Sequence, residues 1–171
     1  QAAVRALLNI FFFFFDTEEL PEDFSKSLTI PIYKGKGDPL ACYSYRGIRL
    51  LEHSMKMLEK ILESRLRKLV VISEVQYGFM QSRSTIDPIF ILRQVQEKYI
   101  EKKKPLHHLF VDLEKAFDRV PRETIVWALR RQMIPEKLIR LVMLTYTASR
   151  TTIRSKLGDS GEIDITVGVH Q

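Results

Sequence analysis

Apolar side chains follow helical spacing in several stretches of the chain. Between residues 54 and 70 they recur at three- and four-residue steps with charged side chains between them, which indicates an amphipathic helix. The same spacing over residues 85–103 predicts another helix, with Asp87 in its first turn, where a negative charge complements the helix dipole. Helices are also predicted over residues 2–15, 121–132 and 135–147.

Strand patterns account for much of the remainder. β-Branched and aromatic residues predict strands over residues 27–33 and 106–113, and Pro31 indicates that the first of them lies at a sheet edge. Residues 151–156 and 162–169 are expected to pair as a hairpin across residues 158–161. The predicted fold class is therefore mixed α/β (α+β), with helices dominating.

A run of five consecutive phenylalanines begins at Phe11 and ends at Phe15. A helix cannot place all five rings on one face, so we expect some of them to be exposed and to mediate association with another protein surface. No stretch reaches the roughly 18–20 apolar residues that span a bilayer. Asp16 follows the run directly, which disfavours a signal peptide. We therefore expect an intracellular protein, in the nucleus or the cytoplasm, with no membrane contact.

The basic composition of the chain favours an acidic partner such as a nucleic acid. The net charge is +6, and residues 34–104 hold 15 basic against 8 acidic side chains. Such a surface suits phosphate groups, because lysine and arginine release the counterions condensed on nucleic acid. Lysine used only for solubility is the open alternative. Cys42 is the single cysteine, so the chain cannot form an internal disulfide.

Asp112 stands at the end of the apolar stretch 106–113 and just before a predicted turn. A carboxylate held at the tip of a strand is a good ligand for Mg²⁺, which prefers oxygen donors, and the main-chain carbonyl of Leu113 could be a second ligand. A helix or turn cap is the equally weighted alternative for Asp112. Asp118 is interpreted as a cap for the helix that opens at Pro121.

Several blocks around Asp112 resemble one known family. Residues 110–121 (FVDLEKAFDRVP) are similar to motif A of the reverse transcriptases of non-long-terminal-repeat (LINE-type) retrotransposons. Residues 45–51 (YRGIRLL) resemble the finger motif of that family, usually Tyr-Arg-Pro-Ile-x-Leu-Leu. Residues 76–85 (QYGFMQSRST) resemble its next block, residues 167–171 (VGVHQ) the opening of motif B, and residues 30–38 the usual lead-in. The blocks occur in the family's order over about residues 20–171.

The resemblance implies a fold and a reaction. The chain would form an N-terminal helical lead-in (residues 1–26), fingers (27–104) and a partial palm (105–171) of a right-hand polymerase, with an incomplete palm sheet. The implied function is RNA-directed DNA synthesis by two-metal-ion nucleotidyl transfer, with an RNA template, a DNA primer, deoxynucleoside triphosphates and Mg²⁺. Motif C, which carries the other catalytic carboxylates, and the thumb are expected beyond the 171 residues.

Roles for single residues follow from the same resemblance. Asp112 would be the catalytic metal ligand, and Phe117 would exclude a 2′-hydroxyl from the nucleotide sugar. Arg83 would bind the triphosphate, since a guanidinium fork suits phosphate oxygens. The other implied nucleotide contacts are Arg46, Gln171 and the backbone of Leu113, and the implied nucleic-acid contacts are Lys34, Lys36 and Arg49.

Some of these residues have an open structural alternative: a core ring for Phe117, and solvated charges for Arg46, Arg49, Lys34 and Lys36. Ser82 replaces the family's usual glycine before Arg83, and a serine would be strained there if the position needs a positive φ.

Three hypotheses for the whole chain follow. It is part of a polymerase, or a degenerate retroelement remnant that acts as a basic nucleic-acid-binding module, or a fragment without a settled fold. One carboxylate and one carbonyl cannot hold two Mg²⁺ ions strongly. We therefore predict weak Mg²⁺ binding and no polymerase activity for the isolated chain.

Overall fold

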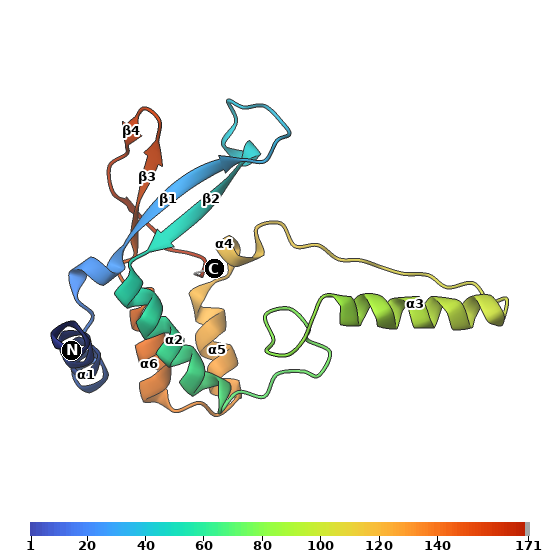
Figure 1. Cartoon of the computed structure of the whole chain (residues 1–171), viewed down its shortest axis with the longest axis horizontal. Coiled ribbons are helices and arrows are strands. Elements are labelled where there is room, and N and C mark those ends of the chain that lie inside the picture. The colour runs from blue at the N-terminus through green and yellow to red at the C-terminus, as the bar shows by residue number, and fades with distance from the viewer. Residues whose placement is uncertain (170–171) are drawn as a thin grey trace. The chain divides into compact units, whose positions relative to one another are not determined.

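The computed structural model describes residues 1–169, apart from the side chain of Ala3. The chain forms two compact units (Figure 1). The first consists of Gln1–Val70 together with the chain from Lys115 onward, and the second is Val71–Glu114. The mixed α/β class with an incomplete open sheet is confirmed.

The sheet of the first unit is ordered β2-β1-β3-β4, and β5 also pairs with β3. Strand β1 is antiparallel to β2 and parallel to β3, so it lies inside the sheet, and its predicted edge position is wrong. Proline is tolerated because the pairing with β3 ends at Thr29, which leaves Pro31 opposite β2 alone. The strands are β1 (Lys26–Tyr33), β2 (Tyr45–Leu51), β3 (Arg150–Ser155), β4 (Gly158–Asp159) and β5 (Ile163–Asp164).

The predicted hairpin forms, but with a different turn. Ser155 pairs with Gly158, so residues 156 and 157 make the turn, where the sequence suggested residues 158–161. Gly158 has a φ of 124°, which only glycine adopts readily, and this explains why the glycine lies at the end of the turn. The returning chain pairs with β3 again only at Ile163 and Asp164, so the predicted strand over residues 162–169 is much shorter than expected.

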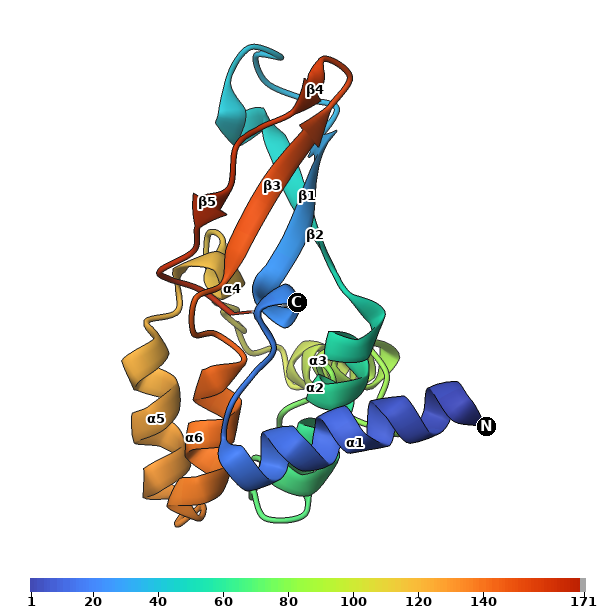
Figure 2. The ribbon, with the colours of Figure 1, turned by 90° about the vertical axis from the view of Figure 1, so that its left-hand side faces the viewer.

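Helices pack below this sheet, with α5 and α6 side by side in both views (Figure 1; Figure 2). Four predicted helices of this unit are confirmed, each within a few residues of its expected bounds. They are α1 (Ala2–Thr17), α2 (His53–Arg67), α5 (Arg122–Arg131) and α6 (Glu136–Leu144). Three shorter elements join them: the 3₁₀ turns η1 (Glu22–Ser25) and η2 (Cys42–Ser44), and α4 (Ala116–Arg119).

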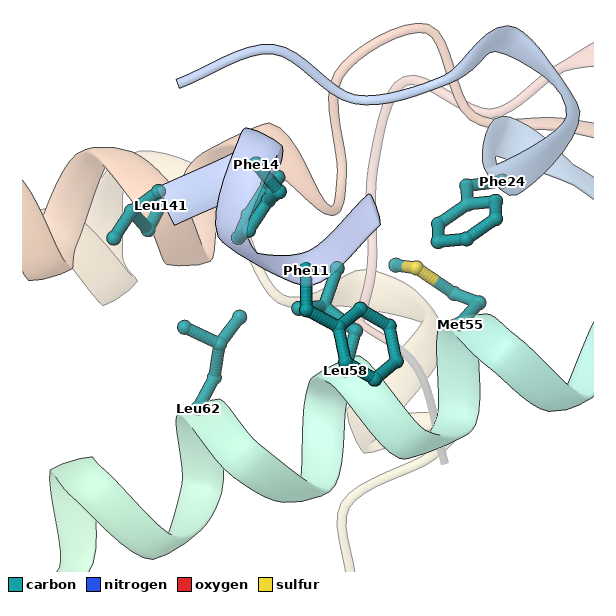
Figure 3. Close-up of a cluster of buried hydrophobic side chains, with 7 residues drawn as sticks. All are labelled: Phe11, Phe14, Phe24, Met55, Leu58, Leu62 and Leu141. Atoms are coloured by element: carbon teal, nitrogen blue, oxygen red, sulfur yellow. The ribbon is translucent and has the colours of Figure 1, made fainter. Parts of the chain in front are cut away.

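The core lies where α1, η1, α2 and α6 meet (Figure 3). Its buried side chains are Phe11, Phe14, Phe24, Met55, Leu58, Leu62 and Leu141. Phe11 and Phe14 are therefore buried, and the surface for association that was expected on Phe11–Phe15 cannot include these two rings. Spacing of three residues puts these two rings on the same face of α1, and this face is the one that packs on α2. Phe12 and Phe13 do remain exposed, and association through them stays a prediction.

An ion pair fixes the end of α1 to α6. Glu18 follows α1 with a φ of 58°, and its carboxylate accepts two hydrogen bonds from the Arg140 guanidinium at 2.7 and 2.8 Å. These bonds lower the pKa of Glu18. No helix in residues 1–169 is both long and apolar enough to cross a membrane.

The second unit contains the predicted helix α3 (Ile86–Glu101) but not the predicted strand. Residues 105–113 are extended without forming a ladder, and Leu109, Phe110 and Val111 are all more than three-quarters exposed. Their apolar, β-branched sequence favours an extended backbone. A strand also needs a neighbour for its N–H and C=O groups, and none is present among residues 1–169.

Candidate functional site

One cleft of the first unit gathers residues from segments far apart in the sequence. It has a volume of about 340 Å³. Its lining residues come from β1, β2, α4 and the segment after β5: Thr29, Gly47, Ile48, Arg49, Leu51, Asp118 and Val169. Three of the sequence blocks singled out above, residues 45–51, 110–121 and 167–171, therefore contribute to a single cleft.

Main-chain hydrogen bonds hold two of these blocks together. The Gly168 N–H donates to the Val120 carbonyl at 3.1 Å, and the Val169 N–H donates to the Phe117 carbonyl at 2.9 Å. Gly168 has a φ of 87°, and a Cβ at this position would lie 2.7 Å from the Asp118 carbonyl oxygen. Only glycine combines that backbone conformation with so close an approach. The segment after β5 is therefore fitted to the α4 turn.

The guanidinium of Arg122 supports the same segment from the first turn of α5. It donates to the carbonyls of Tyr146 at 2.7 Å, Ile165 at 2.8 Å and Gly168 at 3.4 Å. Burial lowers the pKa of Arg122, and the charge of Arg49 lowers it further. Two guanidinium groups thus lie close enough to repel, and the one on β2 belongs to the cleft lining.

Of the predicted nucleic-acid contacts, Arg49 is the one in the cleft lining. It is half-buried on β2, lines the cleft, and makes no side-chain hydrogen bond or ion pair with residues 1–169. Arg46 lies on the same strand and is exposed. In the preceding loop Lys36 is exposed, whereas the Lys34 ammonium donates to the Tyr43 carbonyl at 2.8 Å.

Phe117 and Asp118 lie next to each other on α4. Phe117 is half-buried and is not one of the residues that line the cleft. The prediction that Asp118 caps α5 is wrong, since α5 has Pro121 as its N-cap with no side-chain cap bond among the described residues. Pro121, and not Asp118, occupies the N-cap position, and Asp118 lies on α4 and lines the cleft.

Arg83 belongs to the second unit, and its own loop occupies its guanidinium. The side chain donates to the carbonyls of Glu74 and Gln76, the latter at 3.3 Å, and lies 5.3 Å from the Tyr77 ring centre. Ser82 has a φ of 60°, so the position before Arg83 does adopt the left-handed conformation that favours glycine. The expected strain at Ser82 is therefore present.

Asp112 and Leu113 lie in the second unit on the exposed extended segment. A Mg²⁺ pair needs several oxygen ligands. No group of three or more His, Cys, Asp or Glu residues that could hold a metal is found within residues 1–169. The donor set present here, one carboxylate and one neighbouring carbonyl, does not fit two ions. Gln171 lies outside the described residues.

No role in the cleft was predicted from the sequence for two residues that shape it, Arg122 and Gly168. The sequence does contain an indication for Arg122. A cation in the first turn of a predicted helix opposes the helix dipole, which suggests that other interactions keep it there. Gly168 has a weaker signal, a lone glycine within a predicted strand, which often marks a close approach of two backbones.

Comparison with known proteins agrees with these blocks. The family model described as reverse transcriptase (RNA-dependent DNA polymerase) matches residues 32–169. The chain is 26% identical to the RNA-directed DNA polymerase from mobile element jockey of Drosophila melanogaster, over 99% of this chain and 19% of that protein. It is 25% identical to the probable RNA-directed DNA polymerase from transposon BS of the same species, over 71% of this chain and 13% of that protein.

A third relative is the retrovirus-related Pol polyprotein from type-1 retrotransposable element R2 of Nasonia vitripennis. Its identity is 26%, over 75% of this chain and 12% of the relative. The chain thus spans less than a fifth of the length of each of these curated relatives. The match over residues 32–169 covers most of the sequence. The chain belongs to the reverse transcriptase family, as a domain of the non-long-terminal-repeat, LINE type.

Proposed function

We propose that this chain supplies the fingers and the front of the palm of an RNA-directed DNA polymerase. Residues 1–26 would be the lead-in, 27–104 the fingers and 105–171 the partial palm. The observation that supports this most is the convergence of the finger motif, motif A and the start of motif B on one cleft. In this proposal the cleft receives the template and the incoming nucleotide, and Arg49 in its lining meets their phosphates. Arg46, exposed on the same strand but outside the lining, would be a further phosphate contact.

The other proposed roles rest on position within the family motifs. Phe117 would meet the sugar of the nucleotide and disfavour a 2′-hydroxyl. Arg83 would bind the triphosphate, which requires it to leave the carbonyls of Glu74 and Gln76. Asp112 would be one metal ligand of an enzyme that draws its other ligands from outside residues 1–169. Since the donors present do not fit two ions, the 171-residue chain alone is proposed to be inactive.

Binding of nucleic acid tests the cleft directly. Fluorescence anisotropy of a labelled RNA–DNA hybrid would be measured with the whole chain across a range of salt concentrations. Each lost phosphate contact should reduce the slope of log K against log salt by about 0.7–0.9. We expect R49A and R46A each to reduce the slope by about this amount, because neither side chain makes a hydrogen bond or ion pair within residues 1–169.

R5A is the matched control. Arg5 is an exposed α1 arginine in the same unit, so this variant loses the same charge away from the cleft. Equal losses in R49A and R5A would show that the binding depends on net charge and not on the cleft. Primer extension by the whole chain with Mg²⁺ and deoxynucleotides would refute the proposed inactivity.

A second candidate function is nucleic-acid binding without catalysis, as in a degenerate retroelement remnant. Two observations on residues 1–169 favour it. Arg46 and Arg49 on β2 make no side-chain hydrogen bond or ion pair there, and no group of three or more possible metal ligands is found there. The two candidates differ in their response to nucleotides. A polymerase part should hold the hybrid more tightly when the complementary deoxynucleotide is added, whereas a remnant should not respond.

A further inference from the structure

Arg122 occupies an unusual position for a cation. It is the first residue of α5, where the helix dipole disfavours positive charge, and burial lowers the pKa of its guanidinium. None of its hydrogen-bond partners within residues 1–169 is a carboxylate. A half-buried arginine that is kept against these costs must be compensated by the hydrogen bonds that it donates.

All three of its hydrogen bonds end on main-chain carbonyls. One goes to Tyr146, in the turn after α6, and two go to Ile165 and Gly168, in the segment after β5. The planar guanidinium thus ties three separate backbone positions to the start of α5. A lysine cannot reproduce this pattern, because its single ammonium lacks the fixed fork geometry of the guanidinium.

The segment held by Arg122 is the one that meets α4. Gly168 and Val169 donate their N–H groups to Val120 and Phe117, and Val169 and Asp118 line the cleft. Arg122 is also close to α4 in the sequence, because α4 ends at Arg119, three residues earlier. One side chain next to α4 therefore determines where the segment after β5 lies against α4.

We propose that Arg122 is a positioning residue for the nucleotide-binding cleft. It touches no ligand. It holds residues 165–169 so that Val169 stays beside Asp118 and so that the carbonyl of Phe117 stays bonded, which fixes the α4 turn from which Phe117 projects. That the cleft binds a nucleotide rests on the proposed function. That Arg122 anchors the backbone does not depend on it.

Amide hydrogen exchange in the whole chain tests the anchoring. In R122K the amides of Gly168 and Val169 should exchange about 10- to 100-fold faster, because the loss of charge-assisted hydrogen bonds costs about 1.5–3 kcal/mol. Amides of β1 and β2 should keep their rates. R130K is the matched control, since Arg130 on the same helix also donates two hydrogen bonds, in its case to the exposed Glu136 carboxylate.

Unchanged exchange at Gly168 and Val169 in R122K would overturn the inference. Equal acceleration throughout β1 and β2 would also overturn it, since Arg122 would then serve only global stability. Should R122K fail to fold, R122Q gives the same test with a neutral side chain that retains one amide donor group.

Nucleotide selectivity tests whether the anchoring matters to the site. The whole chain bound to an RNA–DNA hybrid with adenine as the next template base would be titrated with dTTP and with UTP, and hybrid dissociation would be followed. We expect wild type and R130K to respond more strongly to dTTP, and R122K to lose most of that preference.

A preference that persists in R122K would refute the positioning role. If wild type itself shows no preference, the proposed role of Phe117 in excluding a 2′-hydroxyl is refuted. The hydrogen-exchange experiment then decides by itself whether Arg122 anchors the backbone. The two failures are therefore distinguishable.

Discussion

Replacing Phe14 by alanine removes the ring of a side chain that has 0% of its surface exposed. Phe14 belongs to the core formed by α1, η1, α2 and α6, and its ring lies edge-on to Phe15 with centroids 5.3 Å apart. Truncation of a buried phenylalanine typically costs about 3–5 kcal/mol, because transfer free energy is lost and a cavity remains. We expect the cost of F14A to fall within this range.

Phe12 provides a comparison of identical chemistry two residues away. It is 62% exposed, so folding covers little more than a third of its surface. Complete burial of a phenylalanine side chain contributes about 1.5–3 kcal/mol, and the covered fraction reduces this to about 0.5–1 kcal/mol for F12A. The structure thus predicts that F14A is several times more destabilising than F12A, although sequence alone treats the two residues alike.

Urea denaturation followed by tryptophan fluorescence measures this difference. Trp127 is the single tryptophan and lies on α5 in the same unit as the core. With a urea dependence of about 2 kcal/mol per molar, F14A should lower the midpoint by about 1.5–2.5 M and F12A by about 0.25–0.5 M. Equal shifts in the two variants would refute the assigned core. A transition without cooperativity in wild type would instead favour the hypothesis of a chain without a settled fold.

Three shorter predictions concern backbone strain and charge. S82G should slow amide exchange in its loop about two- to fivefold, because relief of the left-handed serine exceeds the entropy that glycine adds to the unfolded chain. G168A should lower the free energy of unfolding of the first unit, measured by urea denaturation, by at least about 1–2 kcal/mol, since its Cβ would meet a backbone carbonyl oxygen. G161A is the control and should not destabilise the unit, because the space around Gly161 is open. The lowered pKa of Glu18 means that its bond to Arg140 stabilises the fold above pH 4.5 and ceases to do so as the pH falls through the lowered value. The stability difference between wild type and E18Q should therefore shrink in acid, and a difference that grows there would contradict the assignment.

Periodicity predicted the helices well because each buries one stripe of apolar residues, a property of the local sequence. It failed at residues 106–113 for a physical reason. An extended apolar stretch specifies a preferred backbone, but a strand exists only where a second backbone supplies hydrogen bonds, and sequence does not say which segment that is. Pro31 shows the same limit, since a proline can sit in an interior strand wherever the neighbour on one side has already ended.

The site was predictable in its motifs but not in its assembly. Arg49 was named from its block and does line the cleft, whereas Asp118 was assigned to a cap position that Pro121 occupies. Arg83 and Asp112 fall in a different compact unit from Arg49 and Phe117. Sequence order within a family cannot reveal such a division, because the compact units follow from packing of side chains and not from the order of motifs.

Main-chain hydrogen bonds, more than ion pairs, determine the shape of the cleft. Ion pairs such as Arg130 with Glu136 and Arg154 with Asp159 join exposed side chains. Salt screens the attraction within such pairs, and they stabilise the fold little. By contrast, uncharged backbone carbonyls accept the hydrogen bonds from Gly168, Val169 and Arg122. Salt weakens such bonds less than it weakens the attraction between two exposed charges. High salt should therefore weaken binding of nucleic acid while leaving the exchange rates of the Gly168 and Val169 amides unchanged. Acceleration of these two amides by salt would show that surface charge, and not the backbone contacts, holds the cleft in place.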